Sequence, residues 1–347
     1  MKKLKHSILS LLLLMGACIV SCSNDDGQTS STDPDEVGGE SFTIPVSSLR
    51  LRDPFILVDK KTSMYYLHFN NNLKIRVYKS KDLSTWKDEG YSFIAKTDFW
   101  GQQDFWAPDV YEYEGRYYLQ YAAPGTQYRI YGDGIYVGDN PLGPFEYMED
   151  NPFSFKPGGF IGGAGHGHTF QDKYGNYWHV ASMTISVRHS FERRLGLFPV
   201  AISARNGMYA HTAWSDYPFY IPDKKVDFNK TDLSMGWNLL SFRKPVSASS
   251  SLPGYEPDKA NDEQIETWWA AQTGKKGEWL QIDMETPVTV NAIHVNFADH
   301  HFKVFAPHPP VVYQFLIEGS ADGKEWMNLV DERENKKDEP HRLFTLD

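Results

Sequence analysis

Cysteine is almost absent from this sequence of 347 residues, whose two cysteines, Cys18 and Cys22, both lie near the N-terminus. Cleavage directly before Cys22 would leave that residue no second thiol to pair with, so we expect a fold without disulfide bonds. A block rich in lysine or arginine is also absent, and the formal net charge is −10. Because nucleic acid and anionic membrane surfaces need clustered positive charge, the sequence argues against both as partners.

The N-terminus has the pattern of an export signal. Three lysines precede the apolar run "ILSLLLLMGACIV", which is too short to span a bilayer comfortably. The run ends in "IVSC", which resembles the bacterial lipobox and implies a lipoprotein signal peptide over residues 1–21, with lipidation of Cys22. Cleavage before Cys18 and an ordinary secretory peptide are the alternatives.

The segment after Cys22 predicts a tether. Within residues 22–46, Cys22 is followed by the polar, acidic stretch "SNDDGQTSSTDPDEVGGE", which has too little apolar surface to fold by itself. The start "CSNDD" resembles the lipoprotein leaders of Bacteroidetes. This resemblance implies an outer-membrane lipoprotein of the cell envelope, either periplasmic or surface-exposed.

Three segments share one shape and predict three β-hairpins. They begin at Asp53, Pro108 and His168, alternate apolar and polar positions, and turn at Asp, Lys, Gly or Asn. An aromatic pair follows each turn, and the three pairs recur 52 and then 60 residues apart: Tyr65-Tyr66, Tyr117-Tyr118 and Tyr177-Trp178. This spacing is typical of propeller blades, which are four-stranded sheets around a central axis. We therefore predict an all-β chain in which residues 47–236 form an incomplete β-propeller.

The opening residues of these units predict a shared pocket. In a propeller the first strand of each blade lines the central channel, so Asp53, Asp109 and the pair His166 and His168 would converge at its mouth. An aspartate before a proline, as at Asp53, is also a common turn former, and this reading stays open for any single position. Equivalent polar openings in three repeats favour the pocket.

Residues 237–347 have a different pattern. The stretches "PVSASS", "DKANDEQIETWWAAQTGKKGEWLQIDM", "VTVNAIHVNFAD" and "YQFLIEGSADGKEWMNLVD" resemble, in this order, a discoidin domain, also called coagulation factor 5/8 type C. The resemblance implies a jelly-roll β-sandwich of a carbohydrate-binding kind. Because the chain stops at "HRLFTLD", where that fold continues into closing strands, we expect this sandwich to be incomplete.

Residues 47–222 carry the motifs "RDPFIL", "FWAPDVYEYEGRYY", "NPLGPF" and "GAGHGHTFQDKYGNYW". In this order and spacing they resemble glycoside hydrolase family 43, five-bladed propeller enzymes that remove arabinofuranose, xylose or galactose units. The resemblance implies that Asp53 is the general base and that Asp109 orients and tunes the general acid. It also implies that His166 lies beside the sugar, where it touches a central calcium ion or water. It implies no required cofactor.

Inverting hydrolysis agrees with that assignment. It needs a carboxylate base and a protonated carboxyl acid about 6.5–9.5 Å apart, with water between the base and the anomeric carbon. Negative charge near the acid, here from Asp109, keeps the acid protonated at neutral pH. Trp100, Phe105 and Trp106 flank Asp109 and are candidates either for a wall on which a sugar ring stacks or for the core.

The sequence departs from the family pattern in two respects. Three blade-like units are readable where five are expected, and propellers typically have four to eight blades. A Glu-Gly-Pro-like acid is also missing, and the gap falls inside the second unit, at Tyr117-Tyr118. Glu112, Glu114 and Glu192 fit a hairpin turn, a solvent face or a pairing with a neighbouring arginine better than they fit that acid.

Metal and serine chemistry are less well supported. The His-x-His spacing of His166 and His168 would point both imidazoles to one face of a strand, and His179 follows on the next strand. A tetrahedral zinc site would need a further cysteine or carboxylate, and none is well placed. A Ser-His-Asp hydrolase is disfavoured because the sequence has no Gly-x-Ser-x-Gly elbow.

The leading hypothesis is an inverting hydrolase that removes arabinofuranosyl, xylosyl or galactosyl units from plant polysaccharides. The missing acid leaves open an alternative, a catalytically defective surface lipoprotein that binds polysaccharide without cutting it. An adhesin that uses only the discoidin domain is a third hypothesis.

Overall fold

The computed structural model describes residues 40–96, 101, 105–124, 131–149, 151–157, 162–184, 193–202, 207–302 and 307–346. Within these ranges the chain forms β-strands and short 3-10 turns without an α-helix, which confirms the predicted all-β class. No stretch of helix in the described part of the chain has the length and apolar character of a membrane span. Cys22 and the predicted signal and tether up to residue 39 lie outside the described residues.

The first blade is a five-stranded antiparallel sheet in the order β1-β5-β4-β3-β2. Its strands are β1 (Ile44–Pro45), β2 (Phe55–Asp59), β3 (Met64–Asn70), β4 (Lys74–Ser80) and β5 (Thr85–Ile94). In β2 the side chains of Leu57 and Asp59 are buried while those of Ile56 and Val58 are exposed, as the two-residue period of a strand requires. The 3-10 turn η1 (Val46–Ser48) follows β1.

The second blade has the strand order β6-β7-β8-β9. Its strands are β6 (Trp106–Tyr113), β7 (Arg116–Pro124), β8 (Tyr131–Gly138) and β9 (Glu146–Tyr147). Strand β7 pairs with β6 on one side and with β8 on the other, and the pairing with β8 runs from Tyr117 to Pro124. Tyr117 and Tyr118, where the sequence analysis places the gap relative to the family pattern, therefore lie within one uninterrupted strand.

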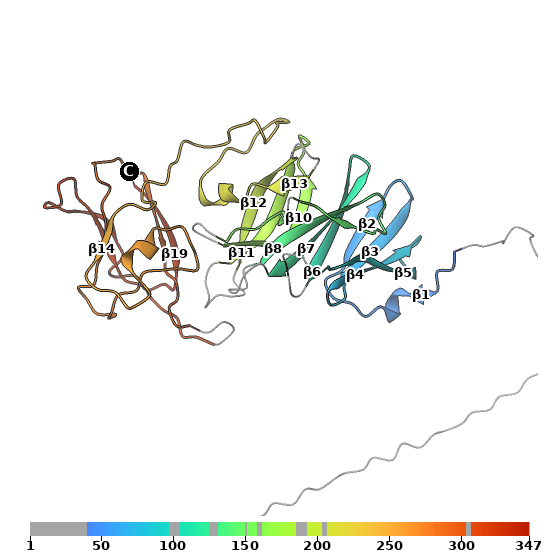
Figure 1. Ribbon diagram of the computed structural model, residues 1–347, viewed down its shortest axis with the longest axis horizontal. Coiled ribbons are helices and arrows are strands. Elements are labelled where there is room, and N and C mark those ends of the chain that lie inside the picture. The colour runs from blue at the N-terminus through green and yellow to red at the C-terminus, as the bar shows by residue number, and fades with distance from the viewer. Residues whose placement is uncertain are drawn as a thin grey trace, which may run out of the picture. The chain divides into compact units, whose positions relative to one another are not determined.

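The third blade has the order β10-β11-β12-β13. Its strands are β10 (Gly162–Gln171), β11 (Tyr177–Thr184), β12 (Arg193–Ile202) and β13 (Met208–Ala210). After the 3-10 turn η2 (Thr212–Asp216), the chain returns to this blade, where the rings of Phe219 and Phe228 lie 6.2 and 5.1 Å from that of Trp178. The three predicted hairpins are thus present as β2/β3, β6/β7 and β10/β11 (Figure 1).

Apolar side chains fill the space between consecutive blades. One cluster joins Val77 and Phe93 of the first blade to Tyr121 and Tyr136 of the second, and the rings of Phe93 and Tyr136 lie 4.3 Å apart. A second cluster joins Tyr118 and Ile135 of the second blade to Val200 and Met208 of the third. Because burying one large apolar side chain contributes about 1.5–3 kcal/mol, both interfaces stabilise the packing of the blades.

The C-terminal domain consists of paired antiparallel strands, in agreement with the predicted β-sandwich. Three pairs make it up: β14 (Val246–Ala248) with β15 (Leu280–Ile282), β16 (Ala292–Asn296) with β19 (His341–Thr345), and β17 (Leu316–Gly319) with β18 (Met327–Asp331). The 3-10 turn η3 (Pro257–Ala260) lies between β14 and β15. Aromatic stacking contributes to its core, where the rings of Phe297 and Tyr313 lie 3.9 Å apart and nearly parallel.

Candidate active site

Asp53 lies two residues before strand β2, at the start of the first blade. Its φ of +50° is in the left-handed region, which aspartate tolerates better than most residues. Its side chain is 26% exposed, and Oδ1 lies 3.8 Å from Nε of Arg52, a side chain that is 75% exposed. An ion pair with such an exposed arginine contributes little, so Arg52 does not hold the partly exposed Asp53 carboxylate firmly.

Asp109 lies in strand β6 of the second blade and is only 3% exposed. The pairing of β6 with β7 is irregular between Trp106 and Asp109, and Ala107 has a φ of +49°. Both carboxylate oxygens of Asp109 lie 3.0 Å from Nδ1 of His168, and the backbone N–H of Thr169 donates to Oδ2 at 3.4 Å. Asp109 therefore binds strand β10 of the third blade directly.

His168 joins the openings of all three blades. Its imidazole contacts Asp109 of the second blade, and its ring centroid lies 6.4 Å from that of Phe55, the first residue of β2. The guanidinium of Arg52, the neighbour of Asp53 in the chain, lies 6.0 Å from the ring of Trp106. The structure therefore brings together the segments that carry Asp53 and Asp109.

The hydrogen bond with Asp109 also changes the acidity of His168. This bond raises the pKa of His168 above its ordinary value of 6.5, and the negative charge of Asp109 adds to the effect, whereas partial burial of the ring acts in the opposite direction. The side chain of His168 remains 51% exposed. It combines a fixed partner on one side of the ring with exposure to solvent.

His166 lies in the same strand but has a different role in the structure. Its side chain is exposed, its φ is +53°, and its backbone N–H donates to Oδ1 of Asp133 at 2.9 Å. The pairing of β10 with β11 shifts between Gly165 and His168, so a bulge interrupts the alternation of the strand. The expectation that His166 and His168 share one face because they are two residues apart is therefore not applicable here.

Asp133 and His179 form a second Asp–His pair. The sequence pattern identified His179 as a candidate but did not identify Asp133. The carboxylate of Asp133 is 1% exposed and accepts hydrogen bonds from the backbone N–H groups of His166 and Gly167, each at 2.9 Å. Its Oδ2 also lies 3.0 Å from Nε2 of His179, which is fully buried. The available signal was a single charged residue between two glycines, "YGDGIYVG", in an otherwise apolar strand.

A chain of polar contacts connects the two Asp–His pairs. The hydroxyl of Thr169 donates to Oε1 of Gln120 at 2.9 Å and lies 3.1 Å from Nδ1 of His179. The amide of Gln120 in turn donates to the hydroxyl of Tyr111 at 3.1 Å. Because Thr169, Gln120 and His179 are buried, each of these bonds satisfies a group that would otherwise be unpaired in the core.

Glycine is required at two positions of β10 by close packing. A Cβ on Gly165 would lie 2.7 Å from Cβ of Tyr131, and a Cβ on Gly167 would collide with the imidazole of His179 and with the backbone oxygen of Val180. The "GAGHG" motif thus allows strand β10 to approach β8 of the second blade and its own neighbour β11 closely enough for the Asp133 contacts.

The three aromatic candidates for a sugar-stacking wall have different outcomes. Phe105 is 1% exposed and packs against Phe93 and Tyr121, with ring centroids 5.8 and 4.7 Å away, so the stacking role expected for it is wrong because it belongs to the core. Trp106 is half-buried, and its ring lies 5.1 Å from that of Tyr131. Trp100 lies outside the described residues.

Of the three glutamates considered as the general acid, the two that the structure describes lie at the turn between β6 and β7. Glu112 accepts a hydrogen bond from the backbone N–H of Gly115 at 2.6 Å and lies 3.5 Å from Nζ of Lys61, so it closes the β6/β7 turn. Glu114 has a φ of +48° in the same turn, and Glu192 lies outside the described residues. In the ranges that the structure describes, no group of three or more His, Cys, Asp or Glu could hold a metal ion.

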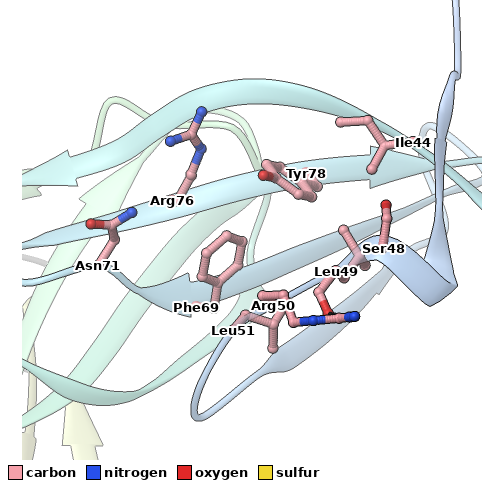
Figure 2. A pocket seen from close by; sticks show the side chains of 9 residues that line it. All are labelled: Ile44, Ser48, Leu49, Arg50, Leu51, Phe69, Asn71, Arg76 and Tyr78. Atoms are coloured by element: carbon pink, nitrogen blue, oxygen red, sulfur yellow. Dashed lines mark hydrogen bonds between the residues drawn. The ribbon is translucent and has the colours of Figure 1, made fainter. Parts of the chain in front are cut away.

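A separate hollow of about 320 Å³ lies on the first blade and includes none of these residues. Figure 2 shows it between the segment from Ile44 to Leu51 and the strands that carry Phe69 and Tyr78. Arg76 lines it but is bonded to Asp88 through two nitrogens. We therefore place the candidate active site at the openings of the three blades and not in this hollow.

Comparison with known families matches residues 42–126 to glycosyl hydrolases family 43 and residues 245–347 to the F5/8 type C domain. Comparison with the curated proteins finds no match. Among solved structures, the chain is similar to an endo-arabinase from Bacteroides thetaiotaomicron VPI-5482, with 51% identity, a TM-score of 0.42, and coverage of 53% of this chain and 65% of that chain.

Two further structures are similar to this chain. An endo-1,4-beta-xylanase from the same organism has 25% identity and a TM-score of 0.38 and is matched over 46% of this chain and 57% of its own. A protein described as a glycoside hydrolase has 20% identity and a TM-score of 0.39 and is matched over 85% of this chain and 64% of its own. The chain thus spans less than two thirds of the length of each of these three structures.

Proposed function

The chain carries a glycosyl hydrolase family 43 domain followed by an F5/8 type C domain, and on this premise we propose that it is an inverting glycoside hydrolase. It would remove arabinofuranosyl, xylosyl or galactosyl units from plant polysaccharides. The observation that supports this proposal is the partly exposed carboxylate of Asp53, two residues before Phe55, whose ring lies 6.4 Å from the imidazole of His168 in the Asp109–His168 pair.

In the proposed reaction, Asp53 is the general base. Its carboxylate takes a proton from a water molecule while the water oxygen attacks the anomeric carbon; the bond from that carbon to the leaving oxygen breaks, and a general acid gives the leaving oxygen a proton. A carboxylate that is partly exposed and only loosely paired can accept that proton, whereas the buried Asp109 and Asp133 already accept hydrogen bonds from histidines. Asp109 acts as a positioning residue through its contacts with β10.

The second domain and the anchor complete the proposal. We infer that the F5/8 type C domain holds the polysaccharide near the propeller. We also infer that a lipid on Cys22 fixes the protein to the outer membrane, in the periplasm or at the cell surface. No cofactor is required in this scheme, so turnover should survive removal of divalent ions by a chelator.

One observation favours a second candidate function. Glu112 and Glu114 lie in the β6/β7 turn, so neither is placed as the proton donor, and we assign that role to no glutamate among the described residues. A protein without that donor would bind polysaccharide without cutting it, as a surface carbohydrate-binding lipoprotein.

Turnover of nitrophenyl arabinofuranoside, xyloside and galactoside separates the two candidates. The hydrolase proposal expects release of nitrophenol by the purified protein and its loss in Asp53→Ala, with retained folding by circular dichroism. Retention on an arabinan or xylan column without any turnover would support the binding protein instead.

A further inference from the structure

Two Asp–His pairs join the same two blades of this protein. In each pair the aspartate belongs to the second blade and the histidine to the third: Asp109 in β6 with His168 in β10, and Asp133 in β8 with His179 in β11. The nitrogen to oxygen distance is 3.0 Å in both. The two pairs therefore have the same chemistry and differ in their surroundings.

Exposure separates the pairs. Both members of the Asp133–His179 pair are shut off from solvent, at 1% and 0% side-chain exposure. In the other pair Asp109 is equally buried, at 5%, but the His168 side chain is 51% exposed. The buried pair, together with Thr169 and Gln120, already connects the two blades by hydrogen bonds. A purely structural connection between the blades therefore does not explain why the histidine of the other pair is exposed to solvent.

Resting on the proposed function, we propose that His168 is a substrate-binding residue, whose imidazole Asp109 holds in place to meet a hydroxyl group of the bound sugar. A carboxylate only accepts hydrogen bonds, so Nδ1 of His168 carries the proton that points to Asp109. Nε2 lies on the side of the ring away from this bond. It hydrogen-bonds to no described residue, since the contacts of His168 run through Nδ1.

The neighbours of His168 fit a sugar in that position. The ring of Phe55 lies 6.4 Å from the imidazole and belongs to the segment that begins with Asp53. A sugar beside the Asp53 carboxylate would therefore be within reach of His168. A hydroxyl group both donates and accepts hydrogen bonds, so it suits Nε2 in either protonation state of the ring. The ligand class is a neutral saccharide rich in hydroxyl groups.

The test compares the two histidines in the full-length protein. Isothermal titration calorimetry measures the binding of arabinotriose, xylotriose and galactobiose to the wild-type protein, to His168→Ala and His168→Gln, and to the surface control Gln171→Ala in the same strand. Thermal unfolding is measured on the same samples and on His179→Ala. Nitrophenyl glycoside turnover is followed in parallel.

We expect His168→Ala to bind the preferred saccharide roughly 5- to 20-fold more weakly, with a melting temperature close to that of the wild type. His168→Gln, which keeps an amide near the position of Nε2, should recover part of the affinity. Gln171→Ala should bind normally. His179→Ala should lower the melting temperature by roughly 10 °C, as expected when one partner of a buried pair is removed.

Four results would overturn the proposal. One is wild-type saccharide affinity in His168→Ala. Another is a fall in melting temperature in that variant as large as the fall in His179→Ala, which would give His168 a structural role. Hydrolysis that needs Asp53 but not His168 would leave the proposed function standing and remove only this inference. Binding that depends on His168 without any hydrolysis would do the reverse, and absence of saccharide binding by the wild type would remove both.

Discussion

The carboxylate of Asp133 and the imidazole of His179 lie 3.0 Å apart in a place that solvent does not reach. Asp133 also accepts hydrogen bonds from the backbone N–H groups of His166 and Gly167, and these two bonds hold the bulge of strand β10 in place. The same bulge sets the position of His168. A buried aspartate thus holds the backbone directly before the exposed His168.

Replacing Asp133 by asparagine should destabilise the protein. The amide has one acceptor oxygen where the carboxylate has two, so an NH₂ group would face at least one backbone N–H. We expect Asp133→Asn to lower the free energy of unfolding by about 3 kcal/mol, which is the upper range for hydrogen bonds to a charged group. Urea unfolding measures the change. Asp139→Asn, an exposed aspartate of the same blade, is the control, and equal midpoints for both variants would contradict the expectation.

Phe105 and Trp106 should respond to truncation in opposite ways. Phe105→Ala removes a buried ring and should lower the free energy of unfolding by about 3–5 kcal/mol. Trp106→Ala should have a smaller effect on stability but should weaken saccharide binding, because Trp106 is the half-buried ring beside Tyr131. Calorimetric affinity and urea midpoints for both variants check this. A Trp106→Ala protein with unchanged affinity would exclude the tryptophan from the sugar wall.

His68 should make the protein less stable as the pH falls. Burial lowers the pKa of His68 to about 3 in the folded chain, whereas the unfolded chain has an ordinary value of 6.5. Between these two values the unfolded state binds a proton that the folded state does not, so stability is lost from pH 6.5 downward. The loss from this residue is about 2 kcal/mol by pH 5.

The variant His68→Gln isolates that effect. Glutamine keeps a polar group near the hydroxyl of Ser92, which lies 3.3 Å from Nδ1 of His68, and it does not titrate. The free energy of unfolding, measured by urea at pH 7 and pH 5, should fall less in the variant than in the wild type. Parallel pH curves for the two proteins would show that His68 is protonated without unfolding.

A methyl group at Gly167 should disturb the third blade. The added Cβ would meet the imidazole of His179 and the backbone oxygen of Val180, so one of them must move. We expect Gly167→Ala to lower the free energy of unfolding by about 1–3 kcal/mol. Gly274→Ala is the matched control, because a Cβ there meets nothing within 4 Å. Similar melting temperatures of the two variants would be evidence against the close approach.

The pKa of His168 should depend on Asp109. The hydrogen bond to this carboxylate is the main cause that raises it, so Asp109→Asn should shift the titration of His168 to lower pH. Nuclear magnetic resonance of the imidazole carbons follows this titration directly. An unchanged titration of His168 would mean that the pair is not formed in solution.

The blades could be predicted from the sequence, and part of the site could not. Alternating apolar positions around the three aromatic pairs identify hairpins because a strand has a two-residue period, which holds in β2. That period fails at His166, where a left-handed residue and a bulge interrupt β10. Asp133 was missed because its partners are distant in sequence, 33 and 46 residues away, and only folding brings them together.

The choice between wall and core for Phe105 and Trp106 also needed the structure. Both are large aromatic residues at the start of a strand, so the sequence pattern predicts a place in the sugar-binding wall or in the core equally well for each. Their contacts separate them, because Phe105 enters the cluster with Phe93 while Trp106 meets Tyr131.

The uninterrupted strand β7 has a consequence for how such chains change over time. Its two faces serve different interfaces, with Tyr121 turned to the preceding sheet and Tyr118 to the following one. The sheet that contains β7 therefore packs through separate apolar faces against the sheet before it and the sheet after it. Whole units can be inserted or deleted at these boundaries without a newly designed interior, whereas chemistry at the mouth depends on which units carry the required side chains.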